Sequence, residues 1–318
     1  MSLSSRTSRV PPNQRTGSSG AAVFVVVTTS LLGLQGCKGF IDVDLPQRDP
    51  ELAVFAFASP HDELHVDVFR VASAGEAATI ESLRINDATV VFSRGDMVDT
   101  LSLSADGGYV ANVRPTYSER FEIRVVAPGY PAATAASAIP DRPSISGVDV
   151  SAVRNDEEWI DYGVSFTLDD MPGPTVYSVG AYTQRPPNEQ TQGVEWTGVF
   201  LTGTDPVFRT ELADVGALQL EVTIPSGSPL YLSDATFDGE RTDLAVETRL
   251  YFRQPPLEAR LVVTAMDADY FEYHKALELQ RRNLEDPFAE PVALYSNVIG
   301  GQGVVAGYAR EETSIVFQ

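Results

Sequence analysis

The sequence has one cysteine, three histidines and two lysines among its 318 residues. A single cysteine excludes an intramolecular disulfide. So few histidines leave little material for a hydrolytic triad or a zinc site. The formal net charge of −21 argues against nucleic acid as a partner, because nucleic acid selects basic surfaces. Composition therefore points away from several common functions without assigning one.

Long hydrophobic runs are also missing. The most apolar stretch, residues 21–34, covers fourteen residues and as a helix would reach only about 21 Å, short of the ~30 Å hydrocarbon core. It follows Arg6, Arg9 and Arg15 with no acidic residue among them. A basic start, a short apolar region and small residues before a break predict a secretory signal peptide at 1–36.

The cysteine stands directly after this signal. Cys37 follows Leu34, Gln35 and Gly36, an arrangement that resembles the bacterial lipobox, with Leu three positions before the cut and a small residue just before it. A thiolate can accept a diacylglyceryl group as a thioether. We therefore predict lipid attachment at Cys37. Gln35 departs from the usual small residue at its position, and an ordinary cleaved signal followed by a free cysteine is the alternative.

Lipid on Cys37 would supply the contact with the membrane. Each buried methylene contributes ~0.8 kcal/mol, and stable anchoring needs about two acyl chains. Without the signal, the net charge becomes −24, which argues against an electrostatic grip on anionic headgroups. The acidic surface is interpreted as a solvated one, with attraction of a cationic partner as the alternative. We expect a chain that is tethered to a membrane and does not span it.

Strand signals dominate the first hundred residues after a tether at 37–47. Two segments alternate apolar and polar residues with period two, which is typical of half-buried antiparallel strands; their apolar positions are Leu64, Val66, Val68, Phe121, Ile123 and Val125. Between them, residues 106–108 read Asp-Gly-Gly and predict a tight hairpin turn. This pattern predicts a β-sandwich domain at 48–142.

A Pro/Ser-rich connector at 137–146 precedes a second β-rich domain at 143–318. Residues 185–215 are polar and rich in turn residues, and we expect a long loop there. One helix, at about 266–283, is predicted from an apolar stripe at three- and four-residue spacing, formed by Met266, Tyr270, Tyr273, His274 and Leu277. We expect this stripe to pack on a sheet rather than line a cofactor site. The fold class is thus mainly β with one C-terminal helix.

Candidate metal and catalytic sites are weak. His61 and His65, with Asp62, Glu63 and Asp67 nearby, would lie ~13 Å apart along a strand, too far for one zinc ion. The acidic stretch 234–243 hints at calcium but lacks EF-hand spacing, so a surface turn is favoured. Residues 300–303 predict a glycine-rich turn. No nucleophile elbow occurs, so we expect no enzyme, no cofactor and no metal.

Two resemblances add to this interpretation. Residues 85–130 resemble the transthyretin-like or carboxypeptidase-regulatory-like β-sandwich, through Gly108-Tyr109 and Gly129-Tyr130. The chain is also similar to a family of Bacteroidota lipoproteins, domain of unknown function 4249. That likeness rests on three segments: Ile-Asp-x-Asp-Leu-Pro at 41–46, Asp-Pro-Phe-x-Glu-Pro-x-x-x-Tyr-Ser-Asn at 286–297, and Gly-x-Gly-x-x-x-Gly-Tyr at 301–308.

The family resemblance implies a surface-exposed outer-membrane lipoprotein that accompanies a TonB-dependent receptor, with an unknown ligand. Acids directly after the cysteine favour surface export, but here residues 38–41 intervene, so the periplasmic face stays open as an alternative. We therefore expect a non-catalytic binding or accessory subunit of an uptake system. The alternative is a structural or adhesive cell-surface lipoprotein. No catalytic residue is carried over from the family, because no activity is established for it.

Overall fold

The structure, a computed structural model, describes residues 49–73, 75–155, 158–185, 195–209, 229–251, 257–283, 289–290 and 292–318. The chain divides into two units, Met1–Pro46 and Gln47–Gln318, and every described residue lies in the second. None of the described helices is long and apolar enough to cross a bilayer.

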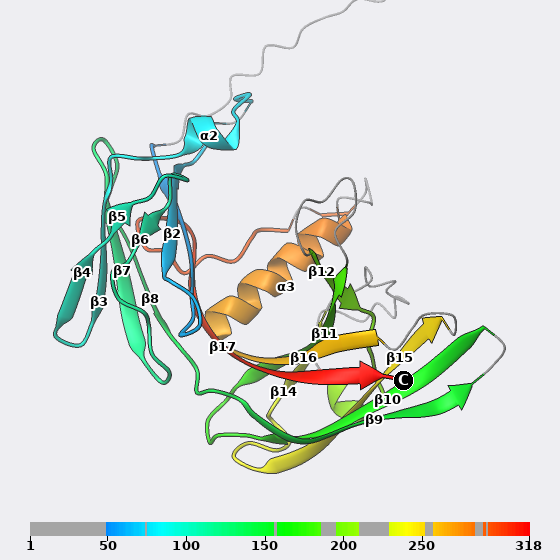
Figure 1. The fold of residues 1–318 in the computed structure, drawn as a ribbon. Coiled ribbons are helices and arrows are strands. Elements are labelled where there is room, and N and C mark those ends of the chain that lie inside the picture. Colours follow the sequence, from blue (N-terminus) through cyan, green and yellow to red (C-terminus); the bar gives the residue numbers. More distant parts are fainter. Residues whose placement is uncertain are drawn as a thin grey trace, which may run out of the picture. The chain divides into compact units, whose positions relative to one another are not determined.

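The fold is mainly β, as predicted, and its strands form three sheets (Figure 1). The long sheet has the order β12 (Glu195–Val199), β11 (Val176–Arg185), β16 (Leu257–Met266), β17 (Gly301–Phe317), β1 (Leu52–Ala58), β2 (His65–Arg70), β6 (Tyr109–Val110) and β5 (Ser102–Leu103), with β14 (Leu230–Ser233) beside β11. Its strands pair antiparallel, except for β1 and β17, which run parallel.

Two four-stranded antiparallel sheets complete the β structure. One has the order β4 (Met97–Thr100), β3 (Thr89–Arg94), β7 (Arg120–Val126) and β8 (Ala133–Ala138). The other has the order β13 (Thr202–Gly203), β15 (Arg241–Tyr251), β10 (Trp159–Asp169) and β9 (Ser144–Asn155). The helices among the described residues are α2 (Ile80–Leu83), α3 (Ala268–Asn283) and the 3₁₀ helix η1 (Pro206–Arg209).

The first hydrophobic core forms where alternate residues of β1 and β2 meet those of β3 and β7. Period two sends one set of side chains inward from each strand. All six predicted apolar positions are buried: Leu64, Val66, Val68, Phe121, Ile123 and Val125. Burying a side chain of this size contributes about 1.5–3 kcal/mol. The predicted hairpin is also confirmed, since β5 pairs with β6 and Gly107 adopts a positive φ of 87°.

The second core lies between β11, β16 and β17 of the long sheet and the sheet that holds β10 and β15. Strand β17 contributes to both cores, because Val305 belongs to the first and Ile315 and Phe317 belong to the second. Between β8 and β10 the chain passes from the first core to the second: Ile139 is buried in the first core, and Tyr162 is the next residue buried in the second. The predicted division at residues 142 and 143 stays a prediction.

Helix α3 confirms the expected helix and begins two residues later than the sequence indicated. Met266 is still in β16, where it pairs with Tyr308 of β17. Asp267 then caps the helix, because its Oδ1 accepts a hydrogen bond from the Tyr270 backbone N–H at 2.7 Å. The helix packs on the face of the long sheet that the two cores leave free, where Phe57 of β1 meets its aromatic stripe.

The glycines of β17 allow backbones to approach closely. A Cβ at Gly307 would lie 2.1 Å from the Ala138 carbonyl oxygen, and one at Gly303 would lie 2.1 Å from that of Val54.

The predicted glycine-rich turn at 300–303 is only partly right. Gly300, with a φ of 80°, makes the turn, whereas the following residues are already in the strand.

Candidate functional site

The predicted lipid site lies outside the described residues. This holds for Leu34, Gln35, Gly36 and Cys37, for the signal peptide at 1–36, and for the tether at 37–47. Much of the expected loop at 185–215 also falls outside them, namely 186–194 and 210–215. The anchor and this loop stay predictions.

His61 and His65 make separate contacts in the structure. His61, in the turn after β1, has its Nε2 2.9 Å from the Arg310 carbonyl oxygen and 3.0 Å from the Tyr117 hydroxyl. His65, in β2, has its Nε2 3.6 Å from Asp67 Oδ1. Because a carbonyl can only accept, the contact with Arg310 requires a proton on Nε2 of His61. That ring therefore ties the β1–β2 turn to β17.

The aromatic stripe of α3 packs on the sheet, as the sequence indicated. The ring of Phe57 lies 5.4 Å from Tyr270, 5.7 Å from Tyr273 and 5.6 Å from His274, measured between centroids. Tyr270 also lies 5.4 Å from Tyr308 of β17. Burial lowers the pKa of His274, so its imidazole is neutral at pH 7. These rings form a packed layer between α3 and the long sheet.

Three carboxylates form the closest acidic group in the described part of the chain. Asp170 follows β10, and Asp234 and Asp238 lie in the turn after β14; one oxygen of each lies within 4.8 Å of the others. Asp170 and Asp234 are buried, at 7% and 2% exposed. Oxygen ligands of this kind suit Ca²⁺. The sequence predicted a surface turn at 234–243, but the turn covers only 234–240 because β15 begins at Arg241, and the fold alone brings Asp170 to it.

Hydrogen bonds give the carboxylate group a structural role. The Gly239 N–H donates to Asp170 at 2.7 Å, the Thr175 N–H donates to Asp234 at 2.6 Å, and the Tyr177 hydroxyl donates to Asp170. Burial, together with the negative charges of Asp170 and Asp238, raises the pKa of Asp234. The group thus ties the loop after β10 to the turn after β14.

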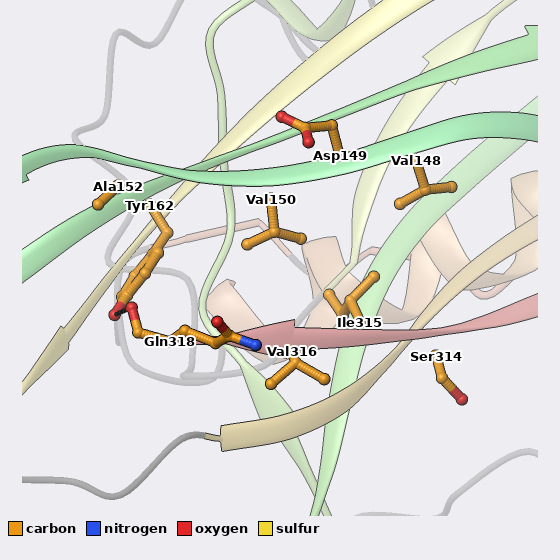
Figure 2. Close-up of a pocket in the computed structure, with 9 residues that line it drawn as sticks. All are labelled: Val148, Asp149, Val150, Ala152, Tyr162, Ser314, Ile315, Val316 and Gln318. Carbon is orange, nitrogen blue, oxygen red and sulfur yellow. Dashed lines mark hydrogen bonds between the residues drawn. The ribbon is translucent and has the colours of Figure 1, made fainter.

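The described surface includes the following two open cavities. One, of about 300 Å³, lies beside the start of α3, and three prolines and three aspartates are among the residues that line it. The other, of about 320 Å³, lies between β9, β10 and the end of β17. Figure 2 shows Val148 and Val150 of β9 and Ile315 of β17 pointing into this second cavity, whereas Asp149 points away from it.

The second cavity separates two strand edges, and we call it the edge groove. Its lining residues are Val148, Asp149, Val150, Ala152, Tyr162, Ser314, Ile315, Val316 and Gln318. Strand β9 is the last strand of its sheet, and β1 pairs with β17 only up to Gly307. Sequence reasoning missed the groove, because the alternation in β9 and β17 predicts strands without showing which edges stay unpaired.

The residues behind the family resemblance hold the C-terminal segment in place. The Tyr295 hydroxyl donates to Asp269 Oδ1 of α3 at 2.5 Å. The Asn297 side chain bridges the backbone of Val305, donating to its carbonyl at 2.7 Å and accepting from its N–H at 3.0 Å. The family model covers residues 40–314. The chain belongs to the family described as Domain of unknown function (DUF4249).

Membership in DUF4249 establishes a lineage, and the description of the family names no activity. The chain matches none of the curated proteins with which it was compared. Two residues of the family signature in this chain make contacts that hold the C-terminal segment in place. Tyr295 hydrogen-bonds to α3, and Asn297 hydrogen-bonds to β17. Residues 286–288 and 291 of the signature lie outside the described residues.

Proposed function

We propose that this DUF4249 protein is a lipoprotein, anchored in a bacterial outer membrane through Cys37, that serves as a non-catalytic binding subunit of a TonB-dependent uptake system. One observation carries the proposal. The only cysteine of the chain stands directly behind Leu34, Gln35 and Gly36, at the end of the apolar stretch 21–34. Lipidation accounts for a lone thiol that an exported protein would otherwise leave free.

The structure supports a binding role through its surfaces. The unit Gln47–Gln318 presents long strands, and its edge groove and its other described cavity are both open to solvent. Two of the three histidines, His61 and His274, are engaged in backbone or ring contacts. The Nε2 of His61 also lies 3.0 Å from the Tyr117 hydroxyl, so this imidazole links the turn after β1 to two other segments of the fold.

The proposed position is the outer leaflet, facing the cell exterior. Two or three acyl chains on Cys37 would hold the protein there without any spanning segment. Removal of Arg6, Arg9 and Arg15 with the signal changes the net charge from −21 to −24, which disfavours adhesion of the protein to anionic headgroups and leaves its surfaces open to a partner. The periplasmic face is the alternative position, and protease treatment of intact cells separates the two.

Extraction of the protein from native membranes in mild detergent tests the uptake role. We expect a TonB-dependent barrel to co-purify at close to one copy per copy. The matched control is Cys37→Ser, which should leave the folded unit intact and release it from the membrane fraction. Recovery of the wild-type protein alone, with its lipid present, would overturn the transporter assignment and leave the anchor standing.

One observation favours the second candidate, an adhesive or structural surface lipoprotein. Trp159 and Tyr251 face each other across β10 and β15 with ring centroids 5.4 Å apart, and they are 41% and 38% exposed. An exposed aromatic pair of this kind suits contact with a neighbouring macromolecule. Adhesion to purified cell-wall or host-surface material that is lost on Trp159→Ala, with no barrel partner, would support this candidate.

A further inference from the structure

Strand β9 has one edge that no described strand covers. Of the strands that the structure describes, β10 alone pairs with β9, so the other edge presents a row of unpaired backbone donors and acceptors. The edge is long, because β9 runs from Ser144 to Asn155, and residues 151–155 are all exposed. The edge groove keeps the space beside it open. An edge of this kind is a template for a further strand.

A β-bulge in β9 determines which of its residues share a face. Ala152 pairs with Tyr162 of β10, and Arg154 pairs with Asp161, so Val153 is an extra residue in β9. Tyr162 is buried in the second core, and Asp161 points the other way because side chains alternate along a strand. Arg154 therefore lies on the outward face of the sheet with Asp161.

Three residues of β9 follow one another at equal steps on this outward face. They pair with every second residue of β10, and the three pairs are Asp149 with Ser165, Ser151 with Gly163, and Arg154 with Asp161. Two residues of a strand span about 6.6 Å. Asp149 and Arg154 thus lie at the same distance from Ser151 in opposite directions, and they carry opposite charges.

Both charges are available to a further strand. Asp149 points outward from β9 (Figure 2), and neither Asp149 nor Arg154 forms an ion pair with a described residue. Asp161 lies opposite Arg154, but its two carboxylate oxygens accept hydrogen bonds from Arg249 at 2.5 and 2.9 Å.

A second copy of β9 matches this pattern. An antiparallel pair of identical strands has a two-fold axis, so a residue on one side of the axis meets the residue at the same distance on the other side. With the axis at Ser151, Asp149 of each copy lies opposite Arg154 of the other. On the inward face Val150 lies opposite Ala152. Opposite charges that face each other across a strand pair stabilise it.

The charge pattern favours a second copy over a strand of uniform charge. A strand that is only basic would repel Arg154, and one that is only acidic would repel Asp149. Facing side chains lie about 5 Å apart, within the Debye length of about 8 Å at physiological salt. Charges of the two copies that lie further apart than this length are largely screened. The net negative charge of the chain therefore opposes the contact only weakly.

We propose that β9 is a self-association edge, where two copies of the protein pair their β9 strands antiparallel about Ser151. The pairing joins the two four-stranded sheets that contain β9 into one continuous sheet. It covers residues 149–154 of each copy, and an interface this small forms a weak, reversible dimer. This inference goes beyond the proposed function, because it requires neither the lipid on Cys37 nor a transporter.

Cysteine cross-linking of the full chain in mild detergent locates the axis. Facing Cα atoms of an antiparallel pair lie about 4.5 or 5.5 Å apart, which suits a disulfide. Ser151→Cys should therefore give a disulfide-linked dimer on mild oxidation. The matched control is Ser144→Cys on the same strand, whose two copies would lie about 40 Å apart and should not cross-link. The wild type shows any cross-link made by Cys37 itself.

Exchange of the two charges tests the register independently. Asp149→Arg and Arg154→Asp each place like charges opposite each other at two contacts, so each should weaken the dimer about tenfold in sedimentation over a concentration series. An equal mixture of the two variants again places opposite charges face to face, and it should associate as strongly as the wild type. A folding defect would persist in the mixture.

Three results would overturn the proposal. One is a wild type that stays monomeric, together with no cross-link through Ser151→Cys. Another is equal cross-linking of Ser151→Cys and Ser144→Cys, because the copies would then meet without this register. The last is association that neither Asp149→Arg nor Arg154→Asp weakens, which would place the interface elsewhere.

Discussion

Asp267 joins Gly307 of β17 to the helix α3 and to strand β8. The Asp267 carboxylate accepts hydrogen bonds from the Gly307 N–H of β17 at 3.1 Å and from the Tyr270 N–H of α3 at 2.7 Å, and Ser137 of β8 donates its hydroxyl to it. The same residue caps α3 and fixes the strand at the point where β1 ends its pairing with β17. One side chain thus connects α3, the long sheet that holds β17 and the four-stranded sheet that holds β8.

Replacement of Asp267 should therefore be costly. Asp267→Ala removes the helix cap and leaves the Gly307 N–H without its acceptor, so we expect a loss of about 2–4 kcal/mol in the free energy of unfolding. Asp267→Asn keeps one acceptor oxygen and should cost clearly less. Urea unfolding followed by circular dichroism measures both. Equal costs for the two variants would contradict the bridging role.

The pH dependence of Asp267 has a definite sign. Burial, with a smaller effect of the Asp269 charge, raises the pKa of Asp267 above its unfolded value of about 3.9. In the window between the unfolded and folded pKa values, the folded state binds more protons, so this group loses stabilising free energy as pH rises. We expect the stability of Asp267→Asn relative to wild type to improve from pH 4 to pH 7. The stability deficit of Asp267→Asn should therefore widen on acidification, as urea unfolding at each pH would measure; a deficit that narrows on acidification would contradict the assignment.

The layer between α3 and β1 should depend on ring packing. Phe57→Ala removes contacts with three rings of α3 and should cost about 2–3 kcal/mol, below the range for fully buried phenylalanine because Phe57 is half-buried. Tyr270→Phe keeps the ring and should change stability by less than about 0.5 kcal/mol, since its hydroxyl has no described hydrogen-bond partner. Thermal unfolding of both variants checks this. A destabilised Tyr270→Phe would show that the hydroxyl, rather than the ring, carries the contact.

Thr248 offers a stabilising substitution. Its side chain is 3% exposed, and its Oγ1 has no hydrogen-bond partner among the described residues. Thr248 lies on β15 and pairs with Tyr162 of β10. Its side chain points to the same face of the sheet as the second core. Thr248→Val keeps the shape and removes a buried hydroxyl, so we expect a gain of about 1 kcal/mol in unfolding free energy. Thr248→Ser, which keeps the hydroxyl and loses a methyl group, is the matched control and should destabilise.

Local pattern predicted the strands and the helix well. The alternation around Val66 and Ile123 identified buried faces, and the stripe through Tyr270 and His274 identified the packed side of α3. These successes share a cause: the side chain's direction follows from the period of its own element. The predicted start of the helix was two residues too early, because Met266 pairs with Tyr308 and still belongs to β16.

Relationships between distant residues were out of reach of the sequence. Asp170 and Asp234 stand 64 positions apart and meet only because two loops close on each other. The edge groove exists because β1 stops pairing with β17 at Gly307. The sequence of one strand does not show which strand pairs with it or where that pairing ends. The parallel pairing of β1 with β17 likewise cannot be predicted from the pattern of residues in either strand.

The mass of the protein's N-terminal peptide, released from native membranes by protease, tests the central claim most directly. The account predicts a peptide that begins at Cys37 and carries a diacylglyceryl group on its sulfur, and it predicts that Cys37→Ser yields no lipidated peptide. An unmodified Cys37, or an N-terminus at any other residue, would contradict the anchor and the function built on it.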